Sequence, residues 1–409
     1  MGFTTSYPAI VRIGDPDAGG PRQDDRLEGD WYVVLGSGPR DYEGDVPPSR
    51  GYIYVIDLKT GDLIRKISIG NHTYMGDCLA VDPDHDYTVD AIYCGTVKKQ
   101  GSNFTGNMLR ILTKESSNVS TWQVTTLYNA DAPITASPEF AFDEAGNLWC
   151  FFGTGKYFGE TDKTDETQQY LYGIKDTCWK YNETDEEWRY DTTCTGSPIT
   201  NLFDATDVKV EATVSDYICM CEGGEVAKNP DGSCPSGSDK VVTKVDLNSV
   251  SVSGCGAYSD WDDCAEHIAN DFDGWKIRLS ISSPAERTIS KPLIIGQLAE
   301  FVTFTPNCDI CGFGGDSYLY SLYYKAGIPY KEPAILLDTA FTETGEDRGI
   351  IQSHVYIGKG VPPPGEGIIP GGGGGGRRNK FIQPSTGEVK NIKQQLRFMP
   401  NKVLFWIEE

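Results

Sequence analysis

Apolar and polar residues alternate in short runs along most of this chain, which is typical of strands that bury one face. In the first 176 residues these runs are separated by turn residues or short loops, and no helical period of useful length occurs among them. The runs are YPAIVRIG, WYVVLGSG, GYIYVIDLKTGDLIRKISIG, CLAVDP, AIYCGTV, NMLRILT and WQVTTLYN. Strands resume with WKIRLSI, PLIIGQLAEFVTFTP and SYLYSLYY, and the chain closes on VLFWIEE. The pattern predicts an all-β protein.

Two segments far apart in the sequence resemble one another. Residues 51–64 and 316–330 each place an aromatic and aliphatic strand before a turn with glycine and a return strand. Blade hairpins of a β-propeller have this pattern, because radial repetition of blades shields sheet edges. We therefore expect residues 1–409 to form one β-propeller domain, with the last strand closing the ring against the first blade.

Two stretches depart from this pattern. Residues 195–274 carry five cysteines, are rich in Gly, Ser and Asp, and show few long strands, so we interpret them as a disulfide-stapled insertion. Its end is expected to form a short helix with one apolar face, made of Trp261, Cys264, Ile268 and Phe272. Residues 362–378 contain six consecutive glycines and are expected to form a flexible loop.

The chain has 12 cysteines, an even number that is high for a reduced compartment. We interpret them as disulfides formed during export. Covalent haem is excluded because the Cys308–Cys311 pair, the one Cys-x-x-Cys, is followed by Gly312 and not by histidine. A structural zinc site stays open for one cluster, although its spacing matches no familiar finger. That cluster comprises Cys219, Cys221, Cys234 and Cys255.

The formal net charge of −23 disfavours nucleic acid and anionic membranes and favours cations. No apolar run reaches the ~20 residues of a transmembrane helix. The opening MGFTTSYPAIVRIG lacks the basic and apolar regions of a signal peptide. Disulfides without an export signal predict a fragment of a longer exported protein.

The sharpest chemical signal is the acidic stretch DPDHDYTVD at residues 82–90. Calcium takes six to eight oxygen ligands at about 2.3–2.6 Å, and alternate carboxylates on a tightly wound loop supply them. Such carboxylates would repel one another without a cation. The sequence therefore predicts a calcium (Ca2+) site, and a solvated acidic hairpin is the alternative. The expected ligands are the side chains of Asp82, Asp84, Asp86 and Asp90 and the backbone carbonyl of Thr88.

The loop differs from an EF-hand. Position 12 is Tyr93 and not a bidentate glutamate, and position 6 is Tyr87 where glycine is usual. A left-handed conformation costs a non-glycine residue about 1–2 kcal/mol, so we expect weakened binding. Cys78 and Cys94 bracket the loop and are expected to form a disulfide across its base.

Other motifs favour structural roles. The three glycines of FFGTGKYFG follow a strand but open no helix, so we expect them to serve tight strand packing and not phosphate binding. Glu286 and Arg287 are candidates for a buried ion pair. The four histidines show no motif spacing, and we predict no catalytic residue and no enzyme activity.

Three stretches together resemble the C-terminal domain of PilC/PilY-type type IV pilus tip proteins. PITASPEFAFDEAGNLWCFFGTGKYFGETD, followed by QQYLYGIKD, is similar to one signature of that family. GWKIRLSISSPAERTISKPLIIGQLAEFVTFTPN, leading into CDICGFGGDSYLYSLYYKAG, is similar to a second. The acidic loop lies at the position of the family's calcium loop. The resemblance covers most of the chain apart from the cysteine-rich insertion.

The resemblance implies a modified seven-bladed, quinoprotein-like β-propeller that binds calcium through the five residues given above. It also implies pilus biogenesis, adhesion to host or abiotic surfaces, and calcium-dependent control of pilus extension and retraction in twitching motility. Minor pilins would be the partners, at an extracellular pilus tip reached through the periplasm. Three features depart from the family pattern: Tyr87, Ala285 in place of a glycine, and the long insertion.

Two other functions are weighed against this one. A quinoprotein-type dehydrogenase would need a pair of adjacent cysteines, but Met220 separates Cys219 from Cys221. A stand-alone secreted adhesin that acts without pilins stays open on the sequence alone.

Overall fold

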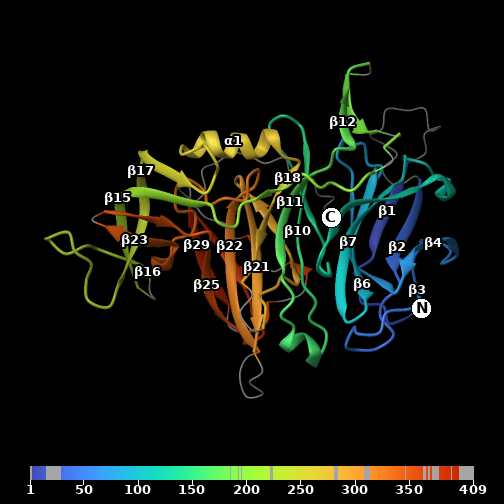
Figure 1. The fold of residues 1–409 in the computed structure, drawn as a ribbon, viewed down its shortest axis with the longest axis horizontal. Helices are drawn as coiled ribbons and strands as arrows, with labels where there is room; N and C mark the ends of the chain where they lie inside the picture. Colours follow the sequence, from blue (N-terminus) through green and yellow to red (C-terminus); the bar gives the residue numbers. More distant parts are fainter. Residues whose placement is uncertain are drawn as a thin grey trace. The chain divides into compact units, whose positions relative to one another are not determined.

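The computed structural model describes residues 2–14, 29–184, 186–191, 193–194, 196–221, 224–280, 284–307, 314–345, 347–362, 365–366, 369–370, 377–387 and 389–395. Strands dominate these residues, and they are accompanied by a single α-helix and three short 3-10 helices in the described part of the chain (Figure 1). The 3-10 helices are Val119–Thr121, Glu160–Thr164 and Asp338–Ala340. The prediction of an all-β protein is confirmed.

As far as they are described, the residues form two compact units. The first comprises residues 2–200 and 279–291, and the second comprises residues 201–278 and 292–395. The expectation of one domain over 1–409 stays a prediction.

Antiparallel sheets of consecutive strands make up the first unit. Two of them have four strands each, in the orders β1-β2-β3-β4 and β5-β6-β7-β8. Strand β10 pairs with β9 and β11, and β12 forms a hairpin with β13. The bounds are β1 (Ala9–Ile13), β2 (Asp30–Gly36), β3 (Arg50–Asp57), β4 (Leu63–Asn71), β5 (Thr73–Val81), β6 (Ala91–Gln100), β7 (Asn103–Leu112), β8 (Gln123–Ala130), β9 (Glu139–Phe142), β10 (Leu148–Gly153), β11 (Tyr170–Lys175), β12 (Trp179–Asn182), β13 (Glu187–Tyr190) and β19 (Ser290–Lys291).

Alternate side chains of these strands build the core of the first unit. Val11, Val34, Ile53, Ile92 and Ile111 come from five different strands, belong to one cluster and are fully buried. Each such burial stabilises the fold by about 1.5–3 kcal/mol. Repeated up-and-down sheets of four strands are the building unit of a β-propeller.

The second unit holds the insertion and the later strands. It contains a four-stranded sheet, β20-β21-β22-β25, a three-stranded sheet, β27-β28-β29, and a sheet in which β15 pairs with β16, β17 and β24. The bounds are β14 (Phe203–Asp204), β15 (Lys209–Cys221), β16 (Gly224–Val226), β17 (Asp239–Ser253), α1 (Trp261–Asp271), β18 (Gly274–Arg278), β20 (Leu293–Ile295), β21 (Leu298–Pro306), β22 (Gly315–Tyr323), β23 (Phe341–Gly345), β24 (Arg348–Ile351), β25 (His354–Lys359), β26 (Gly365–Glu366), β27 (Ile369–Pro370), β28 (Arg377–Ile382) and β29 (Lys390–Gln395).

The insertion corrects one expectation and confirms another. Its strands β15 and β17 have 13 and 15 residues, so the expectation of few long strands was wrong. Their pairing shifts register between Glu211 and Thr213 and again near Asp216, and such irregularities interrupt the alternation that marks a strand. The predicted short helix is α1, whose N-cap Asp260 accepts two backbone N–H groups. Its buried residues include three of the four predicted ones, Trp261, Cys264 and Ile268.

Four disulfides lie within the described residues: Cys78–Cys94, Cys178–Cys194, Cys219–Cys234 and Cys255–Cys264. They confirm the prediction of disulfides. Three cysteines of the possible zinc cluster are thereby oxidised, which removes that alternative. Cys308, Cys311, the six glycines at 371–376 and the closing VLFWIEE lie outside the described residues.

Candidate metal site

The acidic loop joins β5 to β6 and is fixed at its base. Val81 pairs with Ala91 at the last position of the two-stranded ladder, so the chain between them forms the loop. Cys78 and Cys94 lie opposite one another in the same ladder and form a disulfide. The predicted bond across the base of the loop is confirmed.

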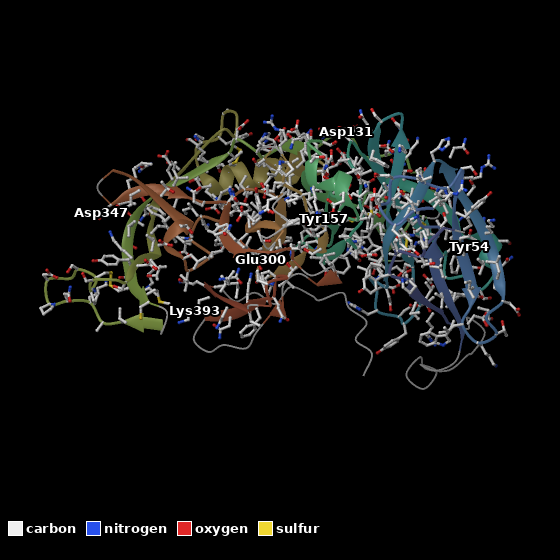
Figure 2. All side chains as sticks on the ribbon, turned by 90° about the horizontal axis from the view of Figure 1, so that it is seen from below. Tyr54, Asp131, Tyr157, Glu300, Asp347 and Lys393 are labelled. Atoms are coloured by element: carbon white, nitrogen blue, oxygen red, sulfur yellow. A yellow bond between two sulfur atoms is a disulfide. The ribbon has the colours of Figure 1, made fainter. Side chains whose placement is uncertain are left out.

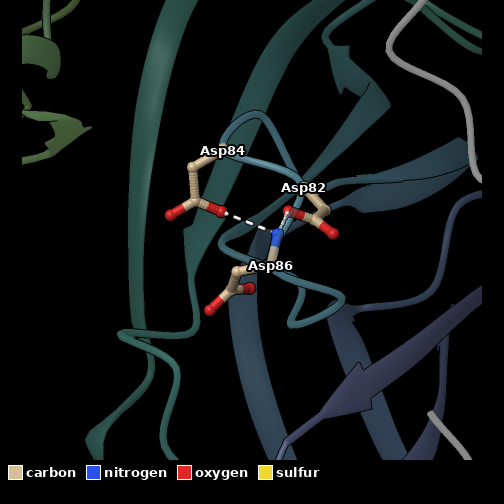
Figure 3. A group of neighbouring side chains, drawn as sticks. All are labelled: Asp82, Asp84 and Asp86. Atoms are coloured by element: carbon tan, nitrogen blue, oxygen red, sulfur yellow. Dashed lines mark hydrogen bonds between the residues drawn. The ribbon is translucent and has the colours of Figure 1, made fainter. Parts of the chain in front are cut away.

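Three aspartates of the loop are close neighbours, and the backbone nitrogen of Asp86 lies between the carboxylates of Asp82 and Asp84 (Figure 3). One carboxylate oxygen from each of Asp82, Asp84 and Asp86 lies within 4.8 Å of the others. The backbone N–H of Asp86 donates to Asp82 Oδ1 and to Asp84 Oδ1, at 3.2 Å each. The N–H of Tyr87 donates to Asp82 Oδ2 at 2.8 Å, and that of Thr88 donates to Asp86 Oδ1 at 2.8 Å. These bonds fix the three carboxylates around the backbone of a tight turn, with Asp82 and Asp86 half-buried and Asp84 exposed.

The turn needs left-handed backbone at two residues. Tyr87 has a φ of 69°, as its position predicts, and His85 has a φ of 61°, which the sequence analysis did not anticipate. Each costs about 1–2 kcal/mol. The end of β1 holds the loop in this shape, because Arg12 donates to the carbonyl of Tyr87 at 2.6 Å and Gly14 N–H donates to Thr88 Oγ1 at 3.2 Å.

Asp90 adds a buried carboxylate to the site. It is 6% exposed, and its Oδ2 atom has no hydrogen-bond partner among the described residues. Oxygens of Asp84, Asp90 and Glu115 lie within 4.8 Å of one another. Asp84 therefore belongs to both acidic groups, which together form one continuous cluster.

Glu115 was missed by the sequence analysis. It lies in the loop after β7, where the N–H of Thr113 donates to the carbonyl of Asp90 at 2.9 Å and that of Glu115 donates to Thr113 Oγ1 at 3.1 Å. A signal existed, because in an antiparallel meander the loop between β5 and β6 and the loop after β7 lie at the same end of the sheet. Acidic residues of that second loop, Glu115 among them, are therefore candidates for the same site.

Burial and mutual repulsion disfavour charge at this cluster. Burial, followed by the hydrogen bond and charge of Asp84, raises the pKa of Asp82 to about 7. Burial, followed by the charges of Asp84 and Glu115, raises the pKa of Asp90 well above its usual value. Carboxylate oxygens without sulfur or nitrogen are the donor set of a hard cation. The residues present therefore fit Ca2+. Thr88 lies buried in the same loop, and a ligand role for its carbonyl stays a prediction.

The other motifs have structural roles in the described residues. A Cβ atom on Gly155 would lie 2.1 Å from the carbonyl oxygen of Thr288, so this glycine permits close packing, as predicted. Arg287 is fully buried, donates to the carbonyls of Lys156 and Asp165, and forms an ion pair with Asp165 at 3.8 Å. Within the described residues, no helix combines the length and apolar character needed to cross a bilayer.

Comparison with known proteins gives consistent matches. Residues 14–184 match the family model of the PilY1 beta-propeller domain. A type IV pilus biogenesis factor PilY1 homolog of Xylella fastidiosa is 24% identical over 359 residues, which cover 80% of this chain and 19% of the relative. The type IV pilus biogenesis factor PilY1 of Pseudomonas aeruginosa is 24% identical over 360 residues, which cover 79% of this chain and 26% of the relative. The chain thus spans about a quarter or less of the curated relatives.

The crystal structure of the P. aeruginosa PilY1 C-terminal domain aligns with a TM-score of 0.57 and 18% identity, covering 95% of this chain and 72% of that chain. This match supports the fold. Together with the family model, it confirms the predicted β-propeller and the resemblance noted in the sequence.

Proposed function

Because this chain belongs to the PilC/PilY family through its β-propeller, we propose that it is the calcium-binding part of a type IV pilus biogenesis factor. It acts by binding and not by catalysis. It takes part in pilus assembly, in attachment of the pilus tip to host or abiotic surfaces, and in calcium-dependent control of extension and retraction during twitching motility. Minor pilins are its partners at the extracellular tip. The names of the curated relatives support the role in pilus biogenesis.

The observation that carries the calcium proposal is the Oδ2 atom of Asp90. A buried carboxylate oxygen without a hydrogen-bond partner is costly, and the carboxylate that carries it has an oxygen within 4.8 Å of oxygens of Asp84 and Glu115. A bound divalent cation would interact favourably with all three carboxylates and offset two of their charges. Asp82 and Asp86 complete the same oxygen cluster.

Calcium occupancy would then act as a local switch. The positive charge of the bound ion favours the compact loop, in which His85 and Tyr87 are left-handed, over more open arrangements of the loop. The acidic loop is hydrogen-bonded to the end of β1 and to the loop after β7. A calcium ion that orders the acidic loop would therefore also favour the ordered conformation of these two segments. Any partner that binds this end of the sheet would sense the cation.

Calorimetric titration with Ca2+ and Mg2+ tests the site directly. We expect calcium binding by the unmodified chain and, in Asp90→Asn, a loss of affinity larger than the roughly 10–100-fold that removal of an outer-shell partner costs. Asp231→Asn is the control, because it makes the same change of side chain at an exposed aspartate outside this cluster, which accepts the backbone N–H of Ser233. Failure to take up calcium at millimolar concentration, or unchanged affinity in Asp90→Asn, would refute the site.

The pilus role is tested in cells that carry the full-length protein. Asp90→Asn is expected to change twitching and surface pili, while Asp231→Asn leaves both unchanged. A pull-down with the minor pilins of the same organism separates a pilus component from a stand-alone adhesin. Absence of any minor pilin from the bound fraction would favour the adhesin.

A further inference from the structure

Four polar side chains meet in the interior of the second unit. They are Glu300 of β21, Ser321 of β22, Lys380 of β28 and Gln394 of β29, with exposures of 0%, 4%, 1% and 0%. Glu300 is labelled in Figure 2. Lys380 Nζ contacts Glu300 Oε2. Such a fully buried amine and carboxyl pair is unusual in a protein interior.

Strand register explains how these residues reach one place. Glu300 lies opposite Ser321 in the β21–β22 ladder. In the β28–β29 ladder, Lys380 lies opposite Ile392, and Gln394 is two residues further along β29. Lys380 and Gln394 are therefore diagonal neighbours on one face, within reach of long side chains.

A simple ion pair with Glu300 leaves N–H donors of the Lys380 ammonium group without acceptors. An ammonium carries three N–H donors, but apart from Glu300 its Nζ atom has no hydrogen-bond acceptor among the described residues. Burial lowers the pKa of Lys380 well below its usual value, which favours the neutral amine. A neutral lysine amine in contact with a carboxyl group is a nucleophile beside an electrophile.

The carboxyl group of Glu300 is arranged asymmetrically. Its Oε1 atom accepts hydrogen bonds from Gln394 Nε2 at 2.6 Å and from Ser321 Oγ at 3.1 Å. Its Oε2 atom faces Lys380 and has no hydrogen-bond donor among the described residues other than that amine. Two fixed donors on Oε1 would stabilise the negative charge that develops there when the carboxyl carbon is attacked.

We propose that Lys380 and Glu300 condense to an intramolecular isopeptide bond. Transfer of one Nζ proton to Oε2 gives the neutral pair, the lone pair of Nζ then attacks Cδ of Glu300, and Oε1 takes the charge under the hydrogen bonds of Gln394 and Ser321. The C–Oε2 bond then breaks, Oε2 leaves with its own proton and one from Nζ as water, and an amide remains. No oxidant, cofactor or other reactant is needed. The amide has one N–H donor in place of three, which reduces the number of buried donors that need an acceptor.

The bond would join β21 to β28, which belong to different sheets of the second unit. Like a disulfide, it would restrict the unfolded chain, and unlike a disulfide it would survive reductants. The bond is independent of the metal site and of the proposed function.

The intact mass of the reduced and denatured full chain tests this inference. We expect a mass lower than that of the sequence by one water, and a branched tryptic peptide in which trypsin no longer cleaves after Lys380. Lys380→Arg is the matched control, since arginine keeps the positive charge but cannot form the amide, and its mass should equal that of its sequence. Gln394→Leu, which removes one donor to Oε1, should slow bond formation in a time course after refolding.

A wild-type mass equal to the sequence mass, after prolonged incubation of folded protein, would overturn the proposal and leave an ion pair. A loss of water that persists in Lys380→Arg would also overturn it. Because the wild-type mass and the branched tryptic peptide at Lys380 together decide the main question, poor folding of a variant does not obscure the result.

Discussion

Two hairpins of this protein each contain a disulfide of nearly equal span, but the charged side chains near the two disulfides have different partners. The acidic hairpin, β5 to β6, is closed by Cys78–Cys94 with a separation of 16 residues. The insert hairpin, β15 to β17, carries Cys219–Cys234 with a separation of 15 residues. In the insert hairpin the ammonium of Lys228 lies 3.5 Å from a carboxylate oxygen of Asp216 and 3.8 Å from the centre of the ring of Tyr217.

In the acidic hairpin, the charged neighbours of each carboxylate are mainly other carboxylates, which repel it. The charges that raise the pKa values of Asp82 and Asp90 come from acidic neighbours. Covalent closure is thus similar in both hairpins, but only the acidic one concentrates negative charge in a partly buried turn. The comparison shows that a disulfide fixes the ends of a loop but does not reduce the repulsion among the carboxylates within it. A cation bound from solution would reduce that repulsion.

Removal of either disulfide should have the largest effect on stability. The double substitutions Cys78→Ala with Cys94→Ala, and Cys219→Ala with Cys234→Ala, are each expected to cost about 3 kcal/mol in chelator, because loops of this size lose similar closure entropy. Denaturant unfolding followed by fluorescence measures this cost.

The two disulfide variants should differ in their affinity for calcium. Loss of Cys78–Cys94 is expected to weaken calcium binding, whereas loss of Cys219–Cys234 should leave the affinity unchanged in the same titration. Equal effects of both variants on calcium affinity would break the distinction between the hairpins.

Asp77, at the base of the acidic hairpin, should make the stability of the protein depend on pH. Burial raises the pKa of Asp77 to about 6, so its ionisation opposes folding. The penalty is absent below about pH 4, grows as the pH rises through 6 and is complete above it, with an upper limit of about 3 kcal/mol. Asp77→Asn should therefore stabilise the protein at pH 8 by about 1–2 kcal/mol and be neutral at pH 4.

Asp231 of the insert hairpin gives the opposite sign. Hydrogen bonds from Ser233 lower its pKa, so its ionisation favours folding above about pH 4. Asp231→Asn should be neutral or slightly destabilising at pH 8. Thermal melts at several pH values measure whether each variant is more or less stable than the unmodified chain. If Asp231→Asn stabilised the protein at pH 8, ionised Asp231 would not favour folding.

Calcium affinity should fall with acidification. Asp82, with a pKa of about 7, binds a proton that calcium must displace, so the affinity should fall by about tenfold per pH unit below pH 7 for one displaced proton. Titrations at pH 5, 6, 7 and 8 give the slope. An affinity that stays constant from pH 5 to 7 would show that the carboxylates of this loop are not the ligands.

The smallest effect is expected for the exposed ion pair of the insert hairpin. Lys228→Ala should cost no more than about 1 kcal/mol, because exposed pairs are screened by water and salt. Denaturant unfolding in low and high salt measures it. A cost that exceeds the loss of the Cys219–Cys234 disulfide would show that charge pairing, and not covalent closure, holds this hairpin.

Local sequence patterns predicted the features that depend on neighbouring residues. The nine-residue acidic loop, the Cys78–Cys94 disulfide and the apolar face of α1 follow from spacing alone. Glu115 and the contact of Lys380 with Glu300 depend on which strands become neighbours and in which register. The long strands of the insertion were missed because bulges interrupt their alternation.

The most direct test of the account is a crystal structure of this chain grown with millimolar calcium, with anomalous diffraction used to locate the ion. The account predicts one calcium peak coordinated by Asp82, Asp84, Asp86 and Asp90, with Glu115 at its border. A structure that shows these carboxylates directed into solvent, with no anomalous peak between them, would contradict it.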